Sequence, residues 1–85
     1  ARPNPMRGAG QVRYFLPEGG GVTLRVFDLE GALVRTLLRG EAPAGPGAVH
    51  WDGRNDRGQI VPAGVYFFRL SGPGVALERK IVLQR

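Results

Sequence analysis

The chain has 85 residues, a formal net charge of +5 and no cysteine, which predicts one small domain and excludes disulfides and cysteine-ligated metal sites. Its 14 glycines and seven prolines favour many turns over long helices, and its hydrophobic content of 42% is typical of a folded domain. No apolar run approaches the roughly 20 residues that span a bilayer, and no initiator Met or signal-peptide pattern is present, so we expect a mature or excised piece of a longer protein.

The first part of the sequence predicts an arm followed by two strands and a hairpin turn. Residues 1–10 contain two prolines and two glycines, so we expect an extended arm or linker there and the folded domain in residues 11–85. Apolar side chains alternate with others in 11–17 and 22–29, as they do in half-buried strands. Asp28–Gly31 then predicts a hairpin turn with a positive φ at its glycine.

Four more strands are predicted in the remainder of the chain. They are expected at residues 32–40, 48–51, 65–70 and 75–84, with loops at 41–47 and 71–74. The strand VYFFRL at 65–70 is the most apolar of them. Six short strands separated by turns that contain glycine and proline predict an all-β sandwich or barrel.

The polar segment between two aromatic residues, Trp51 and Tyr66, is the stretch around which the strands are organised. The residues assigned to a structural turn there are Trp51, Asp52, Gly53, Asn55, Asp56 and Gly58. Asx turns, in which Asn and Asp side chains accept bonds from nearby backbone N–H groups, account for this composition. A calcium loop is the alternative, but an EF-hand spacing would require a Glu where Ala63 stands. We expect no metal and no cofactor.

A succession of motifs resembles one protein family. The motifs are NP at residues 4–5, LPEGG at 16–20, VTLRVFDLEGALVRTLL at 22–38, HWDGRNDRGQIVPAGVYFFRL at 50–70 and ERKIVLQR at 78–85. They resemble the immunoglobulin-like domain of the flagellar hook-capping protein, which is similar to the type A sorting domain of the type IX secretion system. The resemblance implies an all-β, immunoglobulin-like antiparallel β-sandwich of six to seven short strands without enzymatic activity.

The resemblance extends to the sorting motifs of that family. The matching residues are Pro62, Gly64 and Tyr66 in a PxGxY step, and Lys80 and Arg85 in the final strand. The chain departs from the family in having Arg79 beside Lys80, where the family has a lone lysine. These residues do not separate the hook-cap branch from the sorting branch.

Residues for catalysis or nucleic-acid binding are sparse. His50 and Ser71 are the single histidine and the single serine, so a Ser–His–Asp triad would need both of them to meet. The arginines are spread over every predicted strand and both ends of the chain rather than gathered in one run. We therefore expect no enzyme, no nucleic-acid partner and no small-molecule substrate.

Three of the predicted strands place an arginine and a phenylalanine two residues apart, and hence on one face. The pairs are Arg13 and Phe15, Arg25 and Phe27, and Phe67 and Arg69. If the three strands share a sheet, this candidate interaction face exposes a ladder of arginine and phenylalanine. Cation–π packing within the sheet is one interpretation, and docking of a protein partner is the other.

Two functions follow from these observations. The first is a module of an extracellular or cell-surface protein that serves secretion, sorting or attachment through its exposed last strand, with Lys80 and Arg85 supplying charge. The second is a self-assembling subunit of an extracellular filament, built by strand addition of the arm or by the arginine–phenylalanine face, or else a hook-cap-type scaffold. Both require a protein partner, either secretion machinery or a neighbouring subunit, and neither involves a membrane span.

Overall fold

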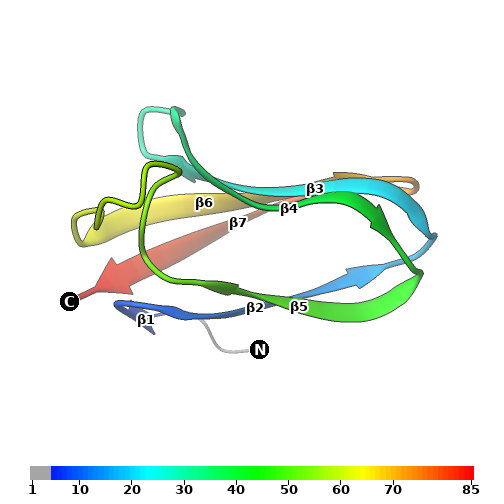
Figure 1. The fold of residues 1–85 in the computed structure, drawn as a ribbon, viewed down its shortest axis with the longest axis horizontal. Coiled ribbons are helices and arrows are strands. Elements are labelled where there is room, and N and C mark those ends of the chain that lie inside the picture. Colours follow the sequence, from blue (N-terminus) through cyan, green and yellow to red (C-terminus); the bar gives the residue numbers. More distant parts are fainter. Residues whose placement is uncertain (1–4) are drawn as a thin grey trace.

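The computed structural model describes residues 5–85 and contains seven β-strands in two sheets (Figure 1). The strands are β1 (Met6–Arg7), β2 (Gly10–Leu16), β3 (Gly20–Asp28), β4 (Leu33–Ala42), β5 (Gly45–Trp51), β6 (Gly64–Gly72) and β7 (Val75–Gln84). One sheet has five strands in the order β1-β7-β6-β3-β4, and β2 pairs with β5 in the other. Neighbouring strands are antiparallel except β1 and β7, which run parallel. The predicted all-β sandwich is confirmed.

The core lies between the two sheets and follows from the alternation along the strands. The buried side chains of the two central strands are Val22, Leu24 and Val26 of β3, and Tyr66, Phe68 and Leu70 of β6. Trp51, at the end of β5, is fully buried. Its ring meets those of Tyr66 and Phe68 edge to face, at centroid distances of 5.6 and 5.8 Å. Such pairs stabilise a core by about 1 kcal/mol each beyond their burial.

Strand β5 begins earlier than the sequence predicts. A loop is expected over residues 41–47, but β4 continues to Ala42 and β5 starts at Gly45. Gly47 lies opposite Tyr14 of β2, and the Tyr14 ring fills the space that a side chain at position 47 would need. The glycines in this stretch therefore mark the close approach of an aromatic ring rather than a loop.

Part of the stretch expected as an arm lies against the domain. Residues 1–4 are outside the described residues. Met6 is 2% exposed, and its strand β1 pairs with β7 in a register that places Met6 beside Leu83. The N–H of Gly8 donates a hydrogen bond of 2.7 Å to the carbonyl of Gln84. A strand of two residues is too short to show an alternation, which is why the sequence predicts only extended chain here.

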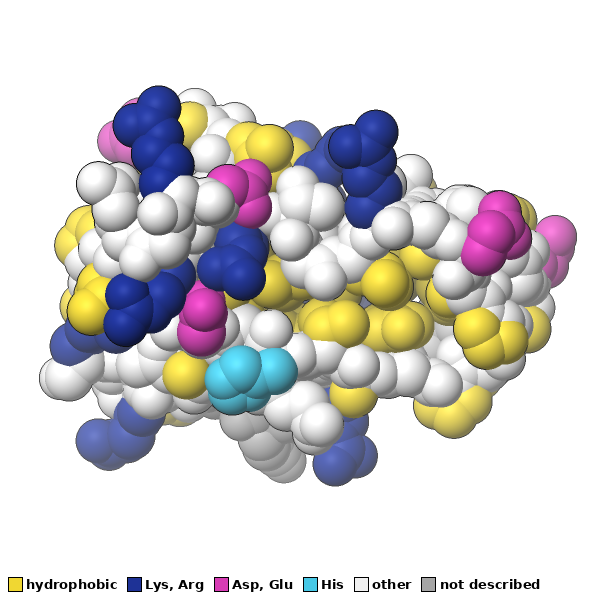
Figure 2. All heavy atoms as spheres, in the orientation of Figure 1, with side chains coloured by type: hydrophobic (Ala, Val, Ile, Leu, Met, Phe, Trp, Pro, Cys, Tyr) yellow, Lys and Arg dark blue, Asp and Glu magenta, His cyan; other side chains and the backbone are white. Residues whose placement is uncertain are grey.

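One side of the sandwich lies between two edge strands, β4 of the five-stranded sheet and β5 of the other sheet. Their half-buried apolar side chains pack against the core and include Val34, Leu37, Leu38 and Val49. Figure 2 shows apolar side chains along the middle of the molecule, with Lys and Arg side chains around them. Among the described residues, no helix is long and apolar enough to cross a membrane.

Candidate functional site

The loop that follows Trp51 is held by its own side chains. A carboxylate oxygen of Asp52 accepts the N–H of Arg54 at 3.0 Å, and the indole N–H of Trp51 donates to the carbonyl of Arg54 at 3.0 Å. The side-chain oxygen of Asn55 accepts the N–H groups of Arg57 and Gln59 at 2.9 and 3.0 Å. These are the bonds of Asx turns, as the sequence predicts.

Arg35 of β4 connects this loop to the five-stranded sheet. A guanidinium nitrogen of Arg35 lies 3.0 Å from a carboxylate oxygen of Asp52, and its Nε lies 3.7 Å from one of Asp56. Asp56 also accepts the backbone N–H of Thr36 at 3.1 Å. The acidic oxygens that a calcium loop would need are thus bonded to groups of the protein. Within residues 5–85, no group of three or more His, Cys, Asp or Glu side chains could hold a metal ion.

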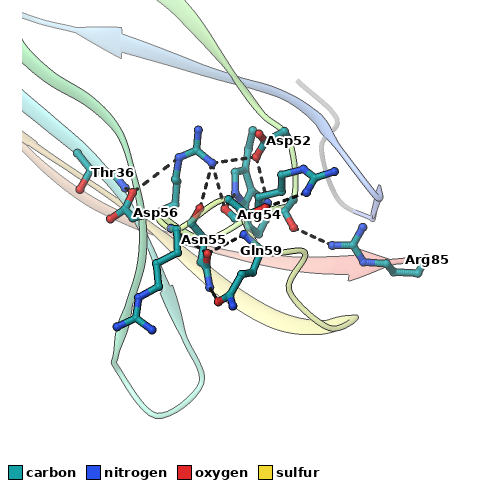
Figure 3. A network of polar contacts seen from close by, with 12 residues as sticks. Thr36, Asp52, Arg54, Asn55, Asp56, Gln59 and Arg85 are labelled. Atoms are coloured by element: carbon teal, nitrogen blue, oxygen red, sulfur yellow. Dashed lines mark hydrogen bonds and ion pairs between the residues drawn. The ribbon is translucent and has the colours of Figure 1, made fainter.

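Arg85 reaches from the end of β7 to the same loop, as Figure 3 shows. Its Nε donates to the carbonyl of Val61 at 3.0 Å, and one Nη donates to the carbonyls of Val61 and Gly53 at 2.6 and 2.8 Å. The guanidinium therefore clamps two points of the loop to the end of the last strand. The guanidinium of Arg85, which the resemblance assigns to the sorting motif, thus donates its hydrogen bonds within the domain.

The PxGxY step positions the start of β6. Tyr66 is 5% exposed, and its hydroxyl donates to the carbonyl of Pro62 at 2.6 Å. Burial raises the pKa of the Tyr66 hydroxyl above 10.0, the neighbouring charge of Arg85 opposes the rise, and that of Asp28 adds to it. Gly64, between the two bonded residues, has a φ of 152°. The step fixes the turn into β6 by a bond between a buried ring and the backbone.

Lys80 belongs to a stretch of β7 that remains accessible. β1 pairs with β7 at Leu83 and Gln84, so among residues 5–85 no strand pairs with the outer edge of β7 from Ala76 to Lys80. All side chains from Ala76 to Lys80 are exposed. Lys80 and Arg85 are both exposed residues, but the guanidinium of Arg85 is hydrogen-bonded to the loop.

A groove of about 600 Å³ separates this stretch of β7 from β2 and is called the β2–β7 groove below. It lies at the part of β7 that β1 does not cover. Its rim carries Phe15, Leu77, Arg13 and Arg79, and its apolar lining includes Val12, Leu24, Phe68, Leu70 and Val75. The sequence gives no direct signal for this groove, because it depends on β2 and β7 facing each other across the two sheets.

The six residues of the candidate interaction face are divided between the two sheets. Arg13 and Phe15 lie on β2, which does not share a sheet with β3 and β6, so the ladder of three pairs is corrected to two. The remaining pairs are in register, with Arg25 beside Arg69 and Phe27 beside Phe67. Period-two alternation assigns a residue to a face of its strand, but it does not say to which sheet the strand belongs.

The two pairs that share a sheet pack on each other. The guanidinium carbon of Arg69 lies 4.5 Å from the ring centroid of Phe27, and its Nε lies 3.5 Å from a carboxylate oxygen of Glu78 on β7. Phe27 and Phe67 are half-buried. Cation–π packing within the sheet accounts for the contact between Arg69 and Phe27.

The single histidine and the single serine lie on different sheets. His50 is an exposed residue of β5, and Ser71 is an exposed residue of β6. The structure does not bring them together in a triad.

Sequence reasoning missed two contributors to the site, Met6 and Arg35. Met6 stands in a segment rich in proline and glycine, and Arg35 follows Val34 in an apparently ordinary strand. A charged residue at a position where alternation would place an apolar one is the available signal for Arg35. Its register partner Val26 is in the core, and only the acidic loop makes an arginine acceptable at that point.

A comparison with protein families decides where the chain belongs. The model of the FlgD Ig-like domain matches residues 7–73, which is more than half of the chain. The chain belongs to the FlgD Ig-like domain family. The predicted resemblance to the hook-capping family is thereby confirmed. No curated protein matches the sequence.

Three solved structures have the same fold. FlgD from P. aeruginosa is 28% identical with a TM-score of 0.67, and the match covers 85% of this chain and 58% of that one. FlgD from Xanthomonas campestris, a hook-capping protein essential for flagellar assembly, is 21% identical with a TM-score of 0.68 and covers 93% and 58%. Dimeric latent PorU from Porphyromonas gingivalis is 23% identical with a TM-score of 0.75 and covers 98% and 9%. The chain thus spans less than two thirds of each of these proteins.

Proposed function

We propose that the chain is a non-enzymatic recognition module of an extracellular or cell-surface protein, and that a sorting or attachment machinery binds it through the outer edge of β7. The observation that carries this proposal is the stretch Ala76 to Lys80, whose side chains are all exposed and which β1 leaves uncovered. An unpaired strand edge accepts a further strand through main-chain hydrogen bonds. Lys80 adds a positive charge at this edge.

The remaining sorting-motif residues support this edge from inside the domain. The bond from Tyr66 to the carbonyl of Pro62 fixes the start of β6, and β6 is the strand that pairs with β7 along its whole length. The guanidinium of Arg85 fixes the other end of β7 to the loop. In this proposal these residues hold the strand in place, and Lys80 contacts the partner.

A delivery assay tests the sorting function. The chain is fused to the C-terminus of a reporter enzyme in a bacterium that has a type IX secretion system, and reporter activity is measured on intact cells. Glu78→Pro removes a backbone N–H at the middle of the outer edge of β7. An edge strand tolerates a proline better than a central strand does, because the missing N–H is not needed for pairing within the sheet. We expect surface activity for the native fusion, its loss for Glu78→Pro, and no change for Arg39→Glu, which alters an exposed residue of β4. A native fusion that stays inside the cells would refute the sorting function.

A hook-cap-type scaffold is the second candidate, and the 28% identity to FlgD from P. aeruginosa over 85% of this chain favours it. Self-assembly of the isolated chain is the form of this function that can be tested directly. Light scattering measures the mass of the purified chain at several concentrations. Ordered polymers would support self-assembly, whereas a monomer at every concentration would refute it. Met6 and Arg7 already pair with their own β7, so assembly would use another surface.

A further inference from the structure

We infer that the β2–β7 groove is a docking site for one extended strand of a partner protein, in which apolar side chains alternate with others and at least one carboxylate enters the groove. This inference rests on the proposed recognition of β7 and adds the chemistry of the partner. It is carried by the backbone edge, the apolar rim and the charge of the groove, which are independent features.

Strand edges without a neighbouring strand border the groove, and on the β7 edge the carbonyl of Glu78 accepts a hydrogen bond of 3.3 Å from an Nη of Arg79. Within residues 5–85, β2 pairs only with β5, and β7 pairs with β6 and, at its C-terminal end, with β1. Gly8 donates its N–H to the carbonyl of Gln84, so Gln84 directs its backbone groups away from β6. Because this direction alternates along a strand, Ala76, Glu78 and Lys80 direct their backbone groups to the same edge, beyond the end of β1.

Apolar side chains at the rim leave surface for an added strand to cover. Phe15 of β2 is 61% exposed and Leu77 of β7 is 42% exposed, and both line the groove. A strand that pairs with β7 directs alternate side chains toward the other sheet. Those side chains would lie between Phe15 and Leu77, so apolar residues at alternate positions of the partner would remove both from water.

The positive charge of the groove favours a partner strand with a negative charge. Arg13 of β2 and Arg79 of β7 both line it and are both exposed. Neither takes part in an ion pair within the described part of the chain. A carboxylate on the entering strand would meet both guanidinium groups near a surface of low dielectric, where opposite charges attract more strongly than in water. A lysine at the same position would be repelled.

A strand of another protein fits this edge better than a second copy of the chain does. The bare edge from Ala76 to Lys80 spans five residues, whereas stable interfaces between folded proteins bury about 1,600 Å² in total. A symmetric pairing through this edge alone would be small. An extended segment instead enters the groove with one set of side chains and bonds to β7 with its backbone, which uses both features of the site.

Two peptides of about eight residues test the inference on the isolated chain, since strands of this length match the edge. In both peptides threonine alternates with valine, and the central valine is replaced by glutamate in one and by lysine in the other. The measurement is a titration of the isotope-labelled chain followed by NMR, together with amide hydrogen exchange. We expect the glutamate peptide to bind at least about tenfold more tightly, a difference of about 1.4 kcal/mol. We also expect it to slow exchange at Ala76, Glu78 and Lys80.

Matched charge reversals show whether the groove makes the selection. Arg79→Glu should reverse the preference between the two peptides, whereas Arg39→Glu, on an exposed part of β4, should leave it unchanged. Glu78→Pro should weaken binding of the glutamate peptide. The charge reversals test the inference even if the proline variant does not fold.

Equal binding of the two peptides, or exchange protection confined to residues outside the groove, would overturn the inference. Protection at β7 that appears without peptide as the protein concentration rises would identify a second copy as the occupant and would also overturn it. If neither peptide binds but Glu78→Pro still blocks surface delivery, recognition of the β7 edge stands and the acidic strand is rejected. If the glutamate peptide binds and the native fusion is not delivered, the sorting function alone fails.

Discussion

The contact between the loop and the stretch that precedes β2 can be tested with two glycines of the same loop. Gly53 and Gly58 have φ values of 73° and 81°, in the left-handed region. A Cβ at position 53 would collide with the carbonyl oxygen of Gly8 and would lie 3.0 Å from an Nη of Arg85. A Cβ at position 58 would meet nothing within 4 Å. Both variants, Gly53→Ala and Gly58→Ala, therefore place an alanine in a strained left-handed conformation. Only Gly53→Ala also collides with Gly8.

The expected losses of unfolding free energy follow from these two terms. A left-handed conformation costs an alanine about 1–2 kcal/mol, and the lower chain entropy of unfolded alanine offsets about 0.4–1 kcal/mol of that. We therefore expect Gly58→Ala to lose about 1 kcal/mol. Gly53→Ala must also displace Gly8 or the clamp of Arg85, which adds the loss of one or two hydrogen bonds and brings the total to about 3 kcal/mol.

Urea unfolding followed by the fluorescence of the buried Trp51 measures both variants against the native chain. For a domain of this size, 1 kcal/mol corresponds to about 4–8 °C in melting temperature, so the two variants should also separate in thermal unfolding by about 10 °C. Equal losses for the two variants would refute the reasoning. They would mean that Gly8 does not lie against the loop, and hence that residues 5–10 are not held on the domain as described.

Two further predictions concern residues of the sorting motif. Arg85→Lys keeps the charge but loses the planar fork that reaches Gly53 and Val61, so it should lower the unfolding free energy by about 1 kcal/mol, and Arg85→Ala should lower it more. Thermal unfolding that ranks lysine equal to arginine would argue against the clamp. Tyr66→Phe should cost about 1 kcal/mol at neutral pH by leaving the Pro62 carbonyl unpaired. Burial raises the pKa of Tyr66 in the folded state. The contribution of the neutral Tyr66 hydroxyl to the unfolding free energy is therefore complete below about pH 10 and falls as the pH rises further. Urea titrations at alkaline pH should show a shallower fall for Tyr66→Phe, and equal slopes would contradict the pKa direction.

Strands with a clean alternation could be predicted from the sequence. The last strand begins and ends where residues 75–84 predict, and the turn at Asp28–Gly31 has the expected positive φ, 89°, at its glycine. The buried side chains of β3 and of β6 stand at alternate positions of each strand. These features depend on neighbouring residues only, so one sequence carries enough information about them.

Features that depend on distant partners could not be predicted. The sequence places Arg13 and Phe15 on a common face of their strand, but it contains nothing to say that this strand pairs with β5 rather than with β3. The acceptors of Arg85 lie 24 and 32 residues away and are backbone carbonyls, which leave no mark in the sequence. The resemblance identified Arg85 as a matching residue, and its position in the fold gave that residue a structural role.

The charges along the bare edge of β7 also explain how an accessible strand can avoid pairing with itself. An antiparallel pairing of two copies that sets Glu78 against Lys80 of the second copy also sets Arg79 directly against Arg79. Shifting the second copy by two residues, which keeps the same backbone groups facing each other, sets Glu78 against Glu78. Like charges directly opposite each other destabilise a sheet. Charged residues on an edge strand are a known protection against aggregation. Here the same residues would admit a strand that supplies a carboxylate opposite Arg79. The charges of the β7 edge would thus both prevent pairing with a second copy and select a partner strand.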